Sequence, residues 1–198
     1  DMYKALFKLI IAIISQPSRT WKMLEIRYFG DGKEEVTPKD YELFLSRYLY
    51  PFLGLLTVAA FFSICTRQEF DLEIALKSSV VSFVSAFGGF HLASYVVNEI
   101  WGGFFKQKKE LQRFQLFVGF GSALLYTLNI IWLLLPDFFF LYIFVLYTVY
   151  IVWEGTTIFL KIEENLHMKM TVLLSAFIIG SPKLIEFFLT VLMPGLHK

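Results

Sequence analysis

Several ionisable side chains lie inside long apolar stretches of this 198-residue chain, where proton transfer or ion binding would require them, and two of them could form a pair. Glu154 lies in the stretch from Phe138 to Lys161, and His91 lies in the stretch from Ser78 to Ile100. An ionised group costs about 2.5 to 3.5 kcal/mol at the centre of a membrane helix, so both side chains should face protein or water. A proton relay would use such a pair, and a static hydrogen bond between two helices would use it equally well.

The composition predicts an all-α, polytopic membrane protein. Hydrophobic residues make up 57% of the chain, above the roughly 45 to 50% of soluble domains. Five apolar runs are long enough to span a membrane: Tyr48 to Thr66, Ser78 to Ile100, Phe114 to Leu135, Phe138 to Leu160 and Met170 to Met193. At about 1.5 Å per residue the fourth run would form a helix of roughly 34 Å, and Pro182 should kink the fifth.

An amphipathic interfacial helix is predicted before these spans, from Met2 to Ser15. Its uncharged run is too short to cross a membrane, and Lys4 and Lys8 share one face. The opposite face is apolar: Phe7, Ile10, Ile11 and Ile14. A signal peptide is the alternative, but no small-residue cleavage site follows. Residues 1–47 would then form a cytoplasmic helix and linker, and residues 48–198 the transmembrane domain.

The charge distribution predicts the orientation of the spans. Lys and Arg gather before the first span and in the loops after the second and fourth spans. The positive-inside rule therefore places the N-terminus in the cytoplasm and the C-terminus outside, as in a bacterial inner-membrane protein. A further start signal lies at Thr37-Pro38-Lys39-Asp40, which has an N-cap residue, a first-turn proline and an acid at the third helical position.

The helix rise converts sequence position into depth below the membrane surface. His91 lies roughly 13 Å, Ser122 about 12 Å and Glu154 about 9 Å from the cytoplasmic ends of their spans. We therefore predict an inner polar layer of these three residues, in which His91 and Glu154 interact because neither is tolerated alone. An outer polar layer is predicted towards the other end: Asn129, Lys183 and Glu186. Lys183 and Glu186 are three residues apart and should pair.

The face of the fourth span that carries Glu154 also carries Tyr147, Tyr150 and Lys161, at spacings of seven and four. This span is predicted to be central in the bundle, with that stripe turned towards the second span.

Small residues predict where helices pack closely. The second span has a stripe at spacings of three and four, and the third span has a shorter pair: Ser78, Ser82, Ser85, Gly89 and Ala93, and Gly119 and Ala123. An internal helix contact is favoured for the stripe over an oligomer face. Gly88-Gly89 would alternatively permit a local deformation beside His91.

A lipid-facing set is predicted at the cytoplasmic surface, because anionic lipids attract Lys and Arg and tryptophan favours the headgroup region. Its members are Lys4, Lys8, Trp21, Lys106, Lys108, Lys109 and Arg113. Glu163-Glu164 with His167 is interpreted as a solvated turn. The net charge of +1 argues against nucleic-acid binding. We expect no cofactor and no metal, since no Cys/His cluster has zinc spacing.

Several short motifs carry a resemblance. Gln16-Pro17-Ser18-Arg19-Thr20-Trp21 follows the first helix, Tyr50-Pro51-Phe52-Leu53-Gly54 opens the first span, and Phe87-Gly88-Gly89-Phe90 lies in the second. With the five-span layout, these motifs resemble the Ypt-interacting protein (Yip) family, particularly its compact bacterial members. Eukaryotic Yip proteins are associated with Rab-type GTPases, vesicle traffic and membrane shaping. The resemblance implies no catalytic residues, and the long cytosolic N-terminal region of those members has no counterpart here.

We therefore expect a non-catalytic membrane protein with a scaffold, membrane-organising or partner-binding role. Its partners would be membrane lipids and a membrane or cytoplasmic protein. The alternative is a small transporter or channel component that uses an intramembrane site at His91 and Glu154. A membrane enzyme is disfavoured, because no acid, base and nucleophile gather in one motif.

Overall fold

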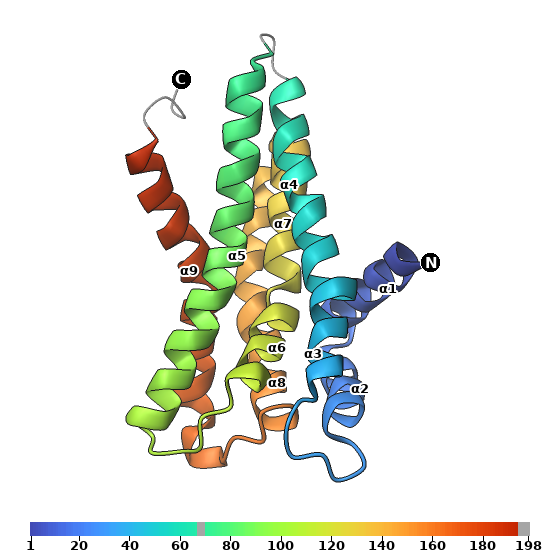
Figure 1. The fold of residues 1–198 in the computed structure, drawn as a ribbon, viewed down its shortest axis with the longest axis vertical. Helices are drawn as coiled ribbons and strands as arrows, with labels where there is room; N and C mark the ends of the chain where they lie inside the picture. The colour runs from blue at the N-terminus through green and yellow to red at the C-terminus, as the bar shows by residue number, and fades with distance from the viewer. Residues whose placement is uncertain (67–69, 194–198) are drawn as a thin grey trace.

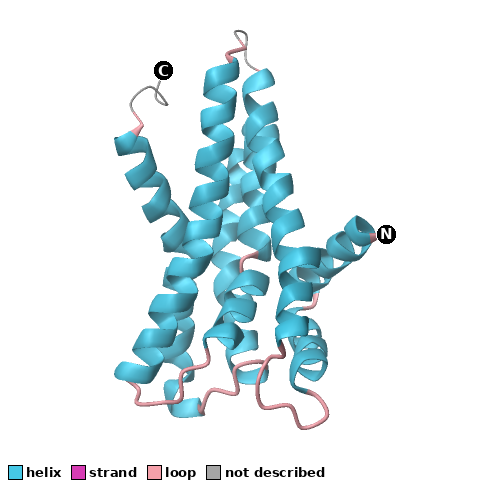
Figure 2. Ribbon diagram, in the orientation of Figure 1, coloured by secondary structure: helices cyan, strands magenta, loops and turns pink. Residues whose placement is uncertain are grey.

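The computed structural model describes residues 1–66 and 70–193, and within these ranges the fold is entirely helical (Figures 1 and 2). The elements are α1 (Met2–Ser15), α2 (Pro17–Phe29), α3 (Pro38–Phe44), η1 (Leu45–Leu49), α4 (Tyr50–Cys65), α5 (Leu72–Gly103), α6 (Leu111–Gly121), α7 (Ala123–Leu134), η2 (Pro136–Leu146), α8 (Tyr147–Ile158) and α9 (Glu164–Leu192). Four helical stretches are long and apolar enough to cross a membrane, and the bent pair α6 and α7 would supply a fifth. The C-terminus, which the sequence analysis placed on the outer side of the membrane, is at residues 194–198 and lies outside the described residues.

The first long helix runs without a gap from Pro38 through α3, η1 and α4 to Cys65. Its start is the predicted one, because the Thr37 hydroxyl accepts a hydrogen bond from the Asp40 amide at 3.1 Å. The π-helical turn η1 includes Arg47, whose carbonyl the ring of Pro51 would meet in a regular α-helix. A π turn at this point relieves that clash.

The predicted third span is broken at Ser122, where α6 and α7 meet at an angle of 41°. No proline causes the bend. The Ser122 hydroxyl donates to the Val118 carbonyl at 2.6 Å and shares that acceptor with its own amide. A serine hydroxyl that bonds to the carbonyl four residues earlier bends a helix, and Gly119 and Gly121 lower the energetic cost of this bend. Ser122 therefore lies at a bend between two helices, and not within a straight span as predicted for the inner polar layer.

The predicted fourth span is not one α-helix and is not central. Residues Pro136–Leu146 form the 3-10 helix η2, and α-helical geometry begins only at Tyr147. None of the η2 side chains is buried, and η2 packs on one side against α7. An apolar sequence is as suitable for contact with lipid as for a protein core, which is why composition alone misplaces this segment.

The remaining long helices pack as a bundle around α5 and α9. These two helices have the largest interface in the fold, α4 packs on α5, and α8 packs against α9 and α2. Gly89 of the predicted small-residue stripe lies in the α5–α9 interface. A Cβ atom added at Gly89 would lie 2.7 Å from the backbone nitrogen of Pro182. Beyond this contact the C-terminal part of α9 leans away from α5 (Figure 1).

The Gly89 contact yields a matched pair of substitutions. Alanine in a helix interior is favoured over glycine by about 0.8 to 1 kcal/mol, so Gly54→Ala should stabilise the protein, since nothing lies within 4 Å of its added Cβ. Gly89→Ala should destabilise it by about 1 to 3 kcal/mol, because the added methyl group meets the rigid backbone of Pro182. Thermal unfolding midpoints in detergent would test both changes. Equal shifts for the two variants would contradict the close α5–α9 contact.

Candidate functional site

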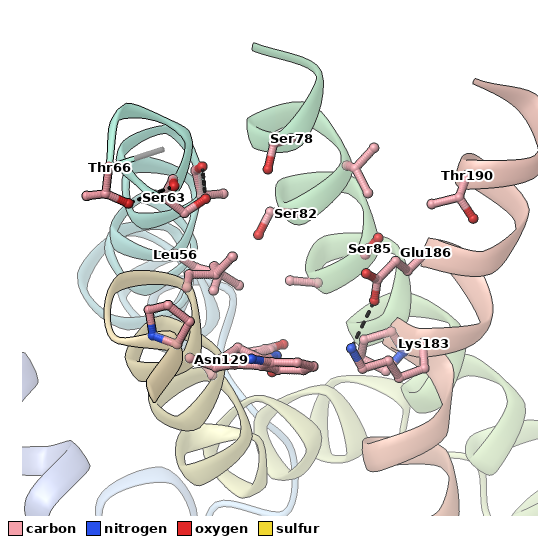
Figure 3. Close-up of a pocket in the computed structure, with 18 residues that line it drawn as sticks. Leu56, Ser63, Thr66, Ser78, Ser82, Ser85, Asn129, Lys183, Glu186 and Thr190 are labelled. Carbon is pink, nitrogen blue, oxygen red and sulfur yellow. Dashed lines mark hydrogen bonds and ion pairs between the residues drawn. The ribbon is translucent and has the colours of Figure 1, made fainter. Parts of the chain in front are cut away.

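A cavity of about 620 Å³ lies between α4, α5, α7 and α9, in the half of the bundle where α9 diverges (Figure 3). Polar lining residues come from all four helices: Ser63 of α4, Ser78, Ser82 and Ser85 of α5, Asn129 of α7, and Lys183 and Glu186 of α9. Apolar side chains such as Leu56, Val81 and Leu133 complete the walls. A partly polar cavity among otherwise apolar helices is the arrangement expected of a binding site.

The charged pair of the cavity is the one predicted from sequence. Lys183 Nζ lies 3.0 Å from Glu186 Oε2, and both side chains remain almost half exposed. The Lys183 ammonium also lies 5.6 Å from the ring centre of Trp132 and 5.9 Å from that of Tyr142. Asn129 lines the same cavity, so the structure brings the three residues of the predicted outer layer together. Ionisable residues in membrane spans are functional candidates by default.

The serines of α5 divide into two kinds. Ser79 and Ser94 donate to the carbonyls of Ala75 and Phe90 at 2.9 and 2.8 Å, as buried helical serines commonly do. The Ser85 hydroxyl is buried in the cavity wall and has no hydrogen-bond partner among residues 1–66 and 70–193. Such a group costs free energy while it is unpaired.

The sequence assigned Ser78, Ser82 and Ser85 to a close helix contact, and that part of the prediction is wrong. Because α9 diverges from α5 beyond Pro182, these serines line the cavity instead (Figure 3). The second predicted packing site, at Gly119, is filled by an aromatic side chain rather than by a helix backbone. The Phe44 ring occupies the space that a Cβ at Gly119 would need, and the Tyr48 hydroxyl donates to the Gly119 carbonyl at 3.1 Å.

The predicted interaction between His91 and Glu154 is not formed. The His91 ring packs edge-on against Phe87 and Phe90, with centroids 4.5 and 4.9 Å apart. No hydrogen bond or ion pair joins His91 to Glu154 in the described part of the chain, and α8 packs on α2, α6 and α9 rather than on α5. Equal depth does not make two residues neighbours, because helix rotation and helix order also decide which side chains meet.

The stripe around Glu154 faces the hairpin formed by α1 and α2, not the second span as predicted. The Tyr147 hydroxyl donates to the Ile14 carbonyl at 2.9 Å. Two turns past Glu154, Lys161 Nζ lies 2.6 Å from Glu25 Oε1 of α2. The residues seven positions before and after Glu154 thus both contact this hairpin.

Trp21 was predicted to lie among lipid headgroups, and this is wrong, because its side chain is fully buried. Its indole Nε1 donates to the Ile151 carbonyl at 2.9 Å, and its ring stacks on Phe117 at 4.7 Å. Gly155 makes room for it, since a Cβ there would lie 2.5 Å from the indole. Trp21 therefore fastens the α1–α2 hairpin to α8. The lone glycine in the apolar run of α8 was the available signal.

The basic segment after α5 is held by neighbouring residues. Arg113 was predicted to face lipid, but its guanidinium donates to the Phe159 carbonyl at 2.8 Å and lies 4.2 Å from the Phe29 ring centre. Lys108 pairs with Glu35 at 2.8 Å. This hydrogen bond lowers the pKa of the Glu35 carboxyl and raises the pKa of the Lys108 ammonium. A second ion pair joins Lys109 to Glu99 at 2.6 Å.

His167 was assigned to a solvated turn, but it lies on α9 and is buried. Its Nε2 lies 2.9 Å from the Trp153 carbonyl oxygen, and the two rings have centroids 3.9 Å apart. The helix begins at Glu164, earlier than the apolar run suggested. His167 thus joins α9 to α8.

Metal-ligating side chains do not gather in groups of three or more His, Cys, Asp or Glu within residues 1–66 and 70–193. No family model, curated protein or solved structure matches this chain.

The cavity predicts a difference in thiol reactivity between two α5 positions. With Cys65 replaced by alanine, Ser82→Cys should react with a small charged methanethiosulfonate reagent, because residue 82 lines the cavity. Ser94→Cys should react at least about tenfold more slowly, because Ser94 is fully buried. Mass spectrometry of the labelled protein would give both rates. Equal rates would contradict an accessible cavity at this place.

The Trp21 contact predicts a specific loss of stability. Trp21→Phe removes the hydrogen bond to Ile151 and should lower the free energy of unfolding by about 1 to 2 kcal/mol. The matched control is Trp101→Phe, since no hydrogen bond from the Trp101 indole is present within the described residues and this side chain is only partly buried. Its effect should be smaller. Equal losses in equilibrium unfolding would show that the Trp21 hydrogen bond does not fasten the hairpin.

Proposed function

We propose that this chain is a non-catalytic, multi-pass membrane protein that organises the bilayer around it, a role of the Yip type. The exposed face of α1 is the observation that carries the proposal. Helices α4, α5, α9, the bent pair α6 and α7, and the segment Pro136–Ile158 would form five spans. In the proposed orientation the α1–α2 hairpin lies at the cytoplasmic side.

Helix α1 has three kinds of surface. Leu6, Ile10 and Ile13 are buried against the bundle. Beside them runs an exposed apolar stripe, in which Tyr3, Phe7 and Ile11 are 45%, 50% and 64% exposed. Lys4 and Lys8 are also exposed and fall at the far edge of that stripe in helical spacing. A helix lying in the membrane interface has this order of surfaces, with lysines reaching the headgroups.

The hairpin would act as a fixed wedge, because it is fastened at several points. Figure 1 shows α1 projecting sideways from the bundle. Its C-terminal end is bonded to Tyr147, and α2 is held through Trp21 and through the Glu25–Lys161 pair. A helix inserted in one leaflet at a fixed angle to membrane-spanning helices would favour curved membrane. Such a role requires no reacting groups.

A transporter is the second candidate, because Lys183 and Glu186 line an open cavity. An aromatic cluster outside the cavity lining supports the first candidate instead. There the rings of Phe44, Tyr48 and Phe120 are in mutual contact, with Phe120 centroids 5.1 and 4.6 Å from those of Phe44 and Tyr48. A closely packed aromatic cluster of this kind would block a continuous polar path between the two halves of the bundle.

The wedge can be tested by vesicle deformation. Reconstituted protein should convert liposomes containing anionic lipid into tubules or smaller vesicles. The double variant Phe7→Asn/Ile11→Asn should do so several-fold less, because each removed apolar side chain contributes about 1.5 to 3 kcal/mol of insertion energy. Ala5→Asn, at an exposed position away from the stripe, is the control and should retain deformation.

Thermal unfolding of the double variant should be nearly unchanged, because Phe7 and Ile11 are not part of the core. Undiminished deformation by the double variant would overturn the proposal. A pH-dependent ion flux in the same liposomes that Lys183→Met abolishes would support the transporter instead.

A further inference from the structure

We infer that the cavity between α4, α5, α7 and α9 binds a phosphoethanolamine group, and that its source is the headgroup of phosphatidylethanolamine entering between the diverging helices α5 and α9. This inference rests on the cavity alone and is independent of the role proposed for α1.

The first ground is charge. Lys183 and Glu186 present an ammonium and a carboxylate 3.0 Å apart, each partly exposed on one cavity wall. A zwitterion with a phosphate and a primary ammonium can pair its two charges with these two groups and bring no net charge into the bundle. A lipid with only a phosphate would face the Glu186 carboxylate without compensation. A quaternary ammonium has no N–H to donate to that carboxylate.

The second ground is the unpaired hydroxyl of Ser85. This side chain is 6% exposed, lines the cavity and has no hydrogen-bond partner in the described part of the chain. In the close-up Ser85 lies near Glu186, and Ser82 and Ser78 lie on the preceding turns of α5 (Figure 3). Hydroxyl donors beside an ammonium suit the oxygen atoms of a phosphodiester. A bound phosphate would give Ser85 a partner that the described residues do not supply.

The third ground is shape and access. A volume of about 620 Å³ lies within the range of small-molecule sites. Near the charged pair α9 leans away from α5 (Figure 1), and residues of both helices line the cavity there. Leu184, Phe187 and Phe188 of α9 are 48%, 62% and 57% exposed. Acyl chains can therefore lie against this apolar helix surface while the headgroup occupies the polar cavity.

The test compares lipids that differ only in the headgroup. Delipidated wild-type protein in detergent is titrated with phosphatidylethanolamine, phosphatidylcholine and phosphatidylglycerol of identical chains, and binding is measured by native mass spectrometry. We expect roughly tenfold tighter binding of phosphatidylethanolamine than of the other two. Lys183→Met and Glu186→Gln should each remove this preference. Equal binding of the three lipids by the wild type would overturn the inference.

Ser85→Ala and Ser94→Ala form a matched pair, since both serines are buried on α5. Ser85→Ala should weaken phosphatidylethanolamine binding several-fold, yet raise the unfolding temperature of the lipid-free protein, because it deletes an unpaired buried hydroxyl. Ser94→Ala should leave binding unchanged, because its hydroxyl bonds within the helix. Unchanged lipid binding by Ser85→Ala would overturn the assignment of the phosphate to this site.

Free phosphoethanolamine distinguishes the two sources of the group. If it competes only weakly with the lipid, the acyl chains contribute and the lipid is the ligand. If it binds as tightly as the lipid, or if it binds and the lipid does not, a soluble ligand occupies the cavity and the lipid assignment is overturned.

Discussion

The rest of the structure depends on the contact between Gly89 of α5 and Pro182 of α9. Glycine lets the two backbones meet, and proline has no N–H, so one backbone hydrogen bond of α9 is absent at this place. On one side of the contact the helices are packed tightly. On the other side they diverge, and a cavity opens whose walls contain Lys183 and Glu186, one and four residues beyond the proline. Close packing and an open site thus have the same local cause.

A second constraint fixes the α1–α2 hairpin. Pro17 starts α2 at a position where its missing N–H is harmless, four residues before Trp21, the side chain that enters the space left by Gly155. The motif from Gln16 to Trp21, which carries the resemblance to Yip proteins, thus has a physical purpose. It turns the chain after α1 and fastens α2 to α8. The exposed stripe of α1 is thereby held at one angle to the bundle.

Sequence patterns correctly predicted the features that depend on residues only a few positions apart. The bounds of α1, the Thr37 cap and the Lys183–Glu186 pair were predicted correctly, because each depends on spacings of three or four residues. Predictions that required a neighbour failed. Tryptophan is a residue type typical of the membrane interface, yet the Trp21 side chain is buried by α6 and α8. The 3-10 geometry of η2 and the hinge at Ser122 have no marker in the apolar pattern, since hydropathy does not distinguish burial in protein from contact with lipid.

The same contacts determine how the two proposed sites relate to each other. A ligand on Lys183 and Glu186 would act beyond Pro182, where α9 has lost a backbone hydrogen bond and bends easily. At Pro182 and on its N-terminal side, three contacts hold α9 to its neighbours. They are the Gly89 contact, the bond of His167 to Trp153 and the Thr156–Thr171 pair. We therefore expect movement of the part of α9 after Pro182 to be absorbed at the proline and not to reach α8. Because α8 carries the α1–α2 hairpin, the angle of α1 should be the same whether the cavity is empty or occupied.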